Sequence, residues 1–166
     1  MKKVLNFLFL ALFLIFGYGL YLYIQPEVGI PNFLIQMSVN KKFPIEKSYA
    51  VGKIKLSHPK TTLIGDTLII EAKYKNQAVG DSISGTMTFQ THVKYDSVDS
   101  KLYLDKFELV SVTKDGKDID MQKHPIIRTA LGASFRGLEK EPILDLNDFS
   151  FVEDIKISDG KFIVYK

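Results

Sequence analysis

The stretch that decides the fold is Ser82-Ile-Ser-Gly-Thr-Met-Thr-Phe-Gln-Thr-His-Val-Lys-Tyr95. Apolar side chains such as Met87 and Phe89 occupy most of its odd positions, and polar side chains occupy the even ones. This alternation is typical of a β-strand with one buried and one solvated face, because successive side chains point to opposite sides of a sheet. At about 3.3 Å per residue the strand would be roughly 45 Å long, more than twice the usual length. The sequence therefore predicts a central strand whose odd-numbered face the rest of the chain must cover.

A second long strand is predicted over residues 101–113, after a polar turn at residues 96–100. The apolar side chains of this strand change parity between Leu104 and Phe107. A change of parity within one strand indicates a β-bulge, here near Asp105, which bends the strand and strengthens its twist. Partial cover of both faces is the alternative. We expect the two long strands to pair antiparallel.

Two helices and several short strands complete the expected domain. Pro31 and Pro125 each precede apolar residues at helical spacing, and the missing N–H of a proline has no cost in the first turn of a helix. They predict helices over residues 31–41 and 125–139. Further strands are predicted over residues 48–57, 67–74, 143–146, 155–157 and 162–165. The order predicts an α+β domain over residues 26–166, in which a long, curved, mostly antiparallel sheet wraps one or two helices.

The first predicted helix has an apolar side formed by Phe33, Leu34 and Met37. Such a side can pack on the sheet, lie on a membrane or contact a ligand. Packing on the sheet is the favoured interpretation, because a helix this short is usually stabilised by tertiary packing.

The N-terminal stretch of residues 4–24 carries no charge and only one polar side chain, Asn6. As a helix it would be roughly 31 Å long, which matches the hydrocarbon core of a bilayer. Lys2 and Lys3 precede it, so the positive-inside rule leaves the N-terminus in the cytoplasm and sends the rest of the chain across. The sequence thus predicts a single transmembrane helix, within an anchor of residues 1–25, and a short linker at 25–30. A cleaved signal peptide is the alternative.

The composition gives no sign of catalytic chemistry or of a nucleic-acid partner. Beyond Lys2 and Lys3 the basic and acidic residues nearly balance, and no basic face is clustered. The absence of cysteine excludes thiol catalysis, disulfides and cysteine-based metal sites. The three histidines show no ligand spacing, and the Asp-rich turns lack the ligand order of a calcium loop. We predict a protein that is not an enzyme and has no catalytic residues, no metal and no cofactor.

The candidate site follows from the lengths of the predicted elements. A helix over residues 125–139 would be roughly 22 Å long, about half the length of the central strand. Either the sheet curls enough to close a filled core, or an apolar channel remains beside the helices. The residues expected to line such a channel are Leu68, Ile70, Ile83, Met87, Phe89, Val93, Leu131 and Phe135.

Several patterns resemble the YceB-like family of small bacterial envelope proteins of unknown function. They are Lys41-Lys-Phe-Pro44, Val93-Lys-Tyr-Asp96, Lys101-Leu-Tyr-Leu-Asp-Lys-Phe-Glu-Leu109, Glu141-Pro-Ile-Leu144 and Ile155-Lys-Ile-Ser-Asp-Gly-Lys-Phe-Ile-Val164. The resemblance implies a fold like the tubular lipid-binding (TULIP) domains, in which a strongly curved sheet wraps a long helix around an apolar channel. Members are typically lipoproteins with an acylated cysteine, which this chain lacks.

The function expected from these observations is that of an envelope protein anchored in the bacterial inner membrane. Its periplasmic domain would bind or transfer a lipid, a fatty acid or another long apolar ligand. The alternative is a structural or interaction domain with a closed core, which binds an unknown protein partner through a sheet edge. A cavity beside the helices would favour ligand binding, and a filled core would favour the interaction domain.

Overall fold

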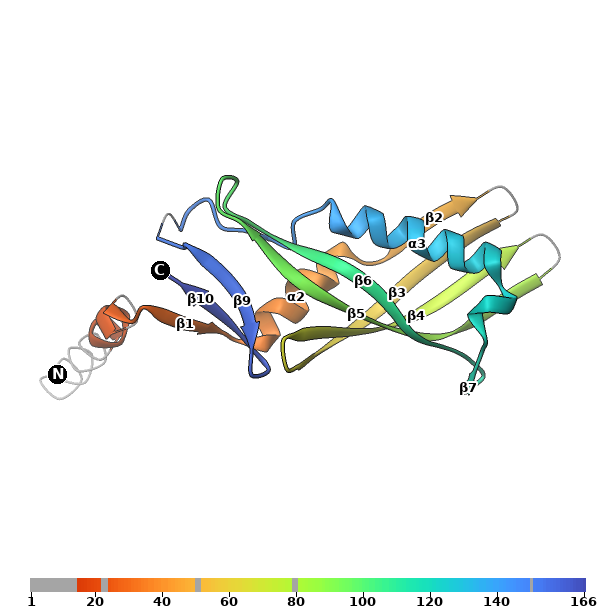
Figure 1. Ribbon diagram of the computed structural model, residues 1–166, viewed down its shortest axis with the longest axis horizontal. Helices are drawn as coiled ribbons and strands as arrows, with labels where there is room; N and C mark the ends of the chain where they lie inside the picture. The colour runs from red at the N-terminus through yellow and green to blue at the C-terminus, as the bar shows by residue number, and fades with distance from the viewer. Residues whose placement is uncertain (1–14, 22–23, 50–51, 79–80, 150) are drawn as a thin grey trace, which may run out of the picture.

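The computed structural model describes residues 15–21, 24–49, 52–78, 81–149 and 151–166. Within these residues the chain forms an elongated molecule with one large and one small β-sheet (Figure 1). Every strand pair in both sheets is antiparallel.

The large sheet is a meander of four long strands that follow one another along the chain. These strands are β3 (Gly52–Ile64), β4 (Thr67–Ala78), β5 (Asp81–Asp96) and β6 (Lys101–Lys114). Short strands extend it, namely β2 (Ile45–Tyr49) beside β3 and both β7 (Lys117–Asp118) and β8 (Leu144–Asp145) beside β6. The small sheet has the order β1 (Glu27–Ile30), β10 (Lys161–Tyr165), β9 (Asp154–Ser158). The helices that follow β1 are α2 (Asn32–Lys42), the 3-10 turn η1 (Met121–Lys123) and α3 (Pro125–Glu139).

The central strand β5 has the buried face that its alternation predicts. Met87 and Phe89 are fully buried, whereas Ser84 and Lys94 on the other face are exposed. β5 pairs antiparallel with β6, with Met87 opposite Val112. The predicted pairing and the predicted buried face are therefore confirmed.

The predicted bulge in β6 is also confirmed. The register with β5 shifts between Gln90 and His92, and Lys106 has a φ of 56° in the left-handed region. The buried side chain of Thr91 fills the irregularity, where its hydroxyl lies 2.7 Å from the carbonyl oxygen of Asp105 and donates to it. Because a bulge increases local twist, this one helps the long strands curve.

Helix α3 covers the inner face of the large sheet, along which it runs in Figure 1. Its side chains Leu131, Phe135 and Leu138 are buried in the core. The antiparallel curved sheet and the helix over residues 125–139 thus match the expectation from sequence.

Two of the expected elements are wrong. The strand expected over residues 48–57 is divided between β2 and β3, and β3 continues to Ile64. A second bulge at His58 and Pro59 interrupts the register with β4 and hides this continuation from a search for strict alternation. The linker expected at residues 25–30 contains β1, which pairs with β10.

The predicted transmembrane helix over residues 4–24 is wrong for the part of the chain that the structure describes. No helix in that part is long and apolar enough to cross a membrane. In the described part of the predicted span, residues 15–21 and residue 24 are helical. Pro26 disfavours helix at the residue before it, and β1 begins directly after it. Residues 4–14 and 22–23 of the predicted span lie outside the described residues.

Candidate functional site

The structure brings the eight predicted channel residues together in the core between β4, β5 and α3. Six of them are buried, with exposed fractions of 8% or less, and Ile83 and Val93 are half-buried against the same core cluster. The buried six are Leu68, Ile70, Met87, Phe89, Leu131 and Phe135. Their role in lining a ligand site stays a prediction.

Aromatic rings fill the middle of this core. The ring centroid of Phe89 lies 5.5 Å from that of Phe107 and 4.9 Å from that of Phe135. The rings of Phe107 and Phe135 are stacked at 5.2 Å. These separations are those of aromatic side chains in direct contact. The space around Phe89 is therefore occupied by protein.

A groove of about 480 Å³ lies beside α3 and borders this core. Leu131 and Phe135 line it together with the charged side chains Glu108, Asp120 and Arg128. Glu108 accepts a hydrogen bond from Gln90 at 2.7 Å, and Asp120 accepts one from the backbone N–H of Gln122 at 2.9 Å. The two carboxylates thus already have partners within the fold.

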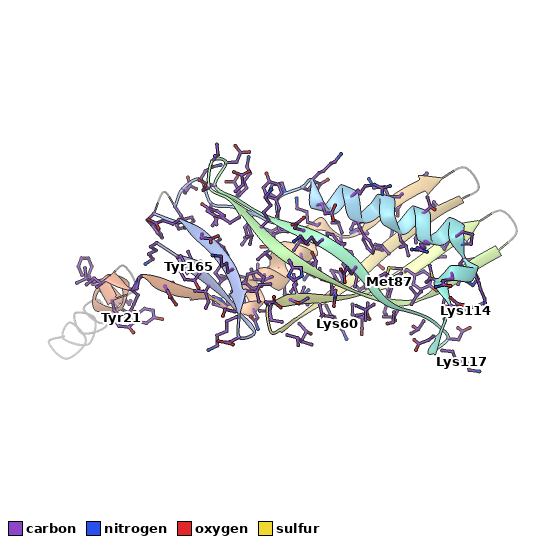
Figure 2. The ribbon with its side chains drawn as sticks, in the orientation of Figure 1. Tyr21, Lys60, Met87, Lys114, Lys117 and Tyr165 are labelled. Atoms are coloured by element: carbon purple, nitrogen blue, oxygen red, sulfur yellow. The ribbon has the colours of Figure 1, made fainter. Side chains whose placement is uncertain are left out.

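A larger and more apolar pocket, of about 580 Å³, lies between α2, the small sheet and the segment that precedes β9. We call it the apolar pocket. Its lining residues are Gly19, Val28, Ile30, Leu34, Met37, Ser38, Lys41, Leu144, Leu146, Phe149, Phe151, Val152, Val164 and Lys166. It is at the end of the molecule that carries Tyr165 and Tyr21, and Lys114 and Lys117 lie toward the opposite end (Figure 2). None of the eight predicted channel residues lines it.

Several large apolar side chains of this pocket remain about half exposed. The exposed fractions are 40% for Leu34, 53% for Met37, 47% for Phe149 and 45% for Phe151. They come from α2 and from the segment between β8 and β9, and they converge on one cavity. Apolar side chains that gather around a cavity and stay exposed mark a surface where another apolar molecule can bind.

Helix α2 presents this surface because a different side of it faces the core. Ile35 and Val39 are buried, whereas Leu34 and Met37 line the pocket. The interpretation that the Phe33, Leu34 and Met37 side packs on the sheet is therefore wrong.

The side chain of Gln36 fixes the helix to the bulge of β3. Its amide nitrogen donates to the carbonyl oxygen of Pro59 at 2.8 Å, and its amide oxygen accepts from the backbone N–H of Thr61 at 2.7 Å.

The opposite wall of the pocket is held by backbone hydrogen bonds. Val28 on β1 lies opposite Val164 on β10, and the N–H of Lys166 donates to the carbonyl oxygen of Pro26 at 3.1 Å. The segment before β9 is tied to the large sheet, where the N–H of Leu146 donates to the carbonyl oxygen of Ser100 at 2.8 Å. The pocket is thus framed by three anchored segments.

The family comparison covers most of this architecture. A family model described as a protein of unknown function, DUF1439, matches residues 32–158. The chain belongs to the DUF1439 family. A search of curated proteins found no match. The DUF1439 match includes α2, the large sheet, α3 and β9, whereas β1 and β10 lie outside it. The apolar pocket of this DUF1439 protein is therefore walled partly by the family region and partly by the strands that flank it.

The described residues of this DUF1439 chain offer no cluster of metal ligands. No three His, Asp or Glu side chains gather there in a way that could hold a metal ion.

One buried polar group stands apart. The hydroxyl of Tyr74 has no hydrogen-bond partner within the described residues, and the side chain is 2% exposed. Burial raises the pKa of Tyr74 above its ordinary value of 10.0, and the nearby charge of Asp115 raises this pKa further.

We expect Tyr74→Phe to stabilise the fold, or leave its stability unchanged, because it removes a buried hydroxyl that lacks a partner. If the variant avoids the whole cost of burying the unpaired hydroxyl, its free energy of unfolding rises by about 1–3 kcal/mol. The pKa of Tyr74 is raised on folding, so the native state keeps its proton longer as the pH rises above about 10. Stability should therefore fall with pH above that value, and less steeply in the variant. Urea unfolding at neutral and alkaline pH measures both effects.

Tyr95→Phe is the matched control, because the hydroxyl of Tyr95 donates to the carbonyl oxygen of Val152 at 3.2 Å. This variant should lose about 0.5–1.5 kcal/mol. Equal losses in the two variants would show that Tyr74 has a partner after all.

Proposed function

We propose that the domain binds the apolar chain of a lipid or fatty acid in the apolar pocket, and holds or hands on that molecule without chemical change. One observation carries the proposal: large apolar side chains from separate segments converge on a cavity of about 580 Å³ and stay about half exposed there. The volume lies within the range of roughly 300–1,000 Å³ that is usual for small-molecule sites.

The energetics of burial are sufficient for such a ligand. Each methylene moved from water into an apolar site contributes about 0.8 kcal/mol, so a chain of twelve carbons gains about 10 kcal/mol. Loss of free motion on binding opposes this by at least about 4 kcal/mol. The difference corresponds to a dissociation constant of about 10–100 µM.

The resemblance to YceB-like envelope proteins, and the tubular lipid-binding fold that it implies, supports the same function. The curved sheet of the large meander, packed on α3, is compatible with such a fold. A location outside the cytoplasm belongs to the proposal as well, because Lys2 and Lys3 precede an uncharged apolar stretch of the kind that directs export. Cell fractionation tests this location. The full chain should be found in the envelope fraction.

Met37→Asp should weaken the binding of 1-dodecanol by the full chain at least tenfold. The carboxylate would stand in the wall of the apolar pocket and would lose water when a chain fills it. Displacement of the neutral fluorescent dye N-phenyl-1-naphthylamine measures this binding. Native mass spectrometry of the purified protein should in addition detect acyl-chain species on the original protein and fewer on the variant.

Phe33→Asp is the matched control, because Phe33 is on the same helix and 61% exposed but does not line the pocket. It should bind the alcohol as the original chain does. Equal weakening by the two substitutions, or no binding to the original chain, would contradict the proposal.

A closed domain that binds a protein partner is the second candidate. It is favoured by the filled core around Phe89, where a channel was expected. It becomes the preferred function if the original chain takes up neither the dye nor the alcohol.

A further inference from the structure

Four lysines gather on the outer face of the large sheet, the face that points away from α3. Ile54 and Leu56 of β3 and Tyr74 of β4 are buried on the inner face, so the side chains that alternate with them point outward. We call the outward group the lysine cluster, and its members are Lys53, Lys55, Lys73 and Lys75. The sequence alone does not show this cluster, because β3 and β4 contribute two lysines each.

The register of β3 with β4 brings these lysines close together. Lys55 lies directly opposite Lys75, and Lys53 and Lys73 lie one row to either side. From the ordinary spacings of a sheet, the four Cα atoms fall within about 13 Å along the strands and about 5 Å across them. Like charges directly opposite each other destabilise a sheet. The stability of the fold therefore gives no reason for this arrangement.

Most of this charge has no partner within the fold. Lys55 forms an ion pair with Glu46 on β2, with 2.7 Å between the ammonium nitrogen and the carboxylate oxygen. The hydrogen bond and the charge of Lys55, followed by the charge of Lys53, lower the pKa of Glu46 below its ordinary value. Lys53, Lys73 and Lys75 are exposed and take part in none of the ion pairs found among the described residues.

The carboxylates that border the lysine cluster do not cancel its charge. Glu71 lies one row beyond Lys73, directly opposite a fifth lysine, Lys60. Along the row of Lys73, Thr86 and an intervening residue of β6 separate it from Asp118 on β7. The cluster and its border thus hold five lysines against the carboxylates of Glu46 and Glu71, and a net positive potential remains.

We propose that the lysine cluster is a docking surface for a bilayer that contains anionic lipids. Charge complementarity favours an anionic partner. A small anion would meet these side chains from one side only and keep water on its other side. A bilayer instead presents many anionic headgroups, so that all four lysines are engaged together.

This docking surface is distinct from the apolar pocket. None of the four lysines lines the pocket. β2, which pairs with β3 beside the cluster, lies at the opposite end of the molecule from the small sheet that walls the pocket (Figure 1). A protein docked through the lysine cluster would therefore keep the apolar pocket free for a ligand.

Flotation of the full chain with lipid vesicles tests the inference. Each lysine near an anionic membrane strengthens binding about fivefold. At low ionic strength, vesicles of phosphatidylcholine with about 30% phosphatidylglycerol should therefore bind the chain about ten- to a hundredfold more tightly than phosphatidylcholine alone. The comparison removes the contribution of apolar contacts, which both kinds of vesicle offer. The preference should shrink at 0.5 M salt, because salt screens the charges.

The double variant Lys73→Gln and Lys75→Gln should reduce this preference to below about fivefold. In thermal unfolding it should be as stable as the original or slightly more stable, because Lys75 no longer opposes Lys55. The matched control is the double variant Lys140→Gln and Lys161→Gln, which removes the same charge from exposed positions outside the large sheet. The control should keep the preference.

Each contrary outcome overturns the inference. One is equal binding of the original chain to the two kinds of vesicle, and another is the same loss of preference in the variant and in the control. Binding of dextran sulfate without a preference between the vesicles would assign the lysine cluster to a soluble anionic polymer instead. None of these outcomes bears on the apolar pocket, whose ligand is tested with an uncharged alcohol.

Discussion

Phe89→Ala is expected to lower the free energy of unfolding by about 3–5 kcal/mol. Phe89 is fully buried, and its ring is in contact with the rings of Phe107 and Phe135. Truncation removes the apolar transfer energy of the ring and leaves a cavity whose walls lose their dispersion contacts. Those walls are long strands and a helix fixed by many other contacts, so they relax little. Urea unfolding of the full chain, followed by circular dichroism, measures the loss.

Phe33→Ala makes the same chemical change on the surface of α2, where the ring is 61% exposed. Its expected effect is below about 1 kcal/mol. A loss at Phe89 as small as that at Phe33 would mean that the core around the aromatic cluster can collapse or is already open, and the channel expected from the sequence would return to consideration.

Gly85→Ala is expected to cost about 2–4 kcal/mol, although alanine is normally the better residue in a strand. A Cβ at this position would overlap the carbonyl oxygen of Thr113 on β6 and lie 3.0 Å from the ring of Tyr74. The obstacle is backbone, so relief requires a shift of the β5–β6 ladder itself. The gain from a less flexible unfolded chain, about 0.4–1 kcal/mol, is too small to offset this.

Gly29→Ala provides the comparison, because the nearest atom to its added Cβ is a carbonyl oxygen at 3.9 Å, an ordinary contact. That variant should be neutral or slightly stabilised. Thermal unfolding measures the stability of the two alanine variants. A Gly85→Ala protein as stable as the original would show that β5 and β6 do not approach so closely at this position.

The fold was predictable wherever one face of an element is buried. Alternation over residues 82–95 predicts β5 because the inner face of the strand packs in the protein core and the outer face meets water. The same reasoning failed at Pro59, where a bulge interrupts the register with β4 and changes the face of the following residues while the strand continues. It also failed on α2, which has apolar side chains on more than one side, so that periodicity could not tell whether Ile35 or Leu34 faces the core.

The candidate site was less predictable than the fold. The apolar pocket joins Val28, Met37, Leu146 and Val164, which are far apart in the sequence and belong to elements that each look ordinary. The available signal was weak: Phe149 and Phe151 are large apolar residues in a polar stretch without helical or strand periodicity. Only the tertiary arrangement reveals that such residues share a cavity.

The pairing of β1 with β10 has a consequence for the order of events during synthesis. β1 leaves the ribosome before the whole meander, yet its partner β10 follows the meander along the chain. At about 5–20 residues per second, β1 waits roughly seven to thirty seconds before its partner strand emerges. The meander can form its local hairpins during that delay, because each long strand pairs with its immediate successor. The apolar pocket is therefore completed late in folding, because Val164 on β10 forms part of its wall.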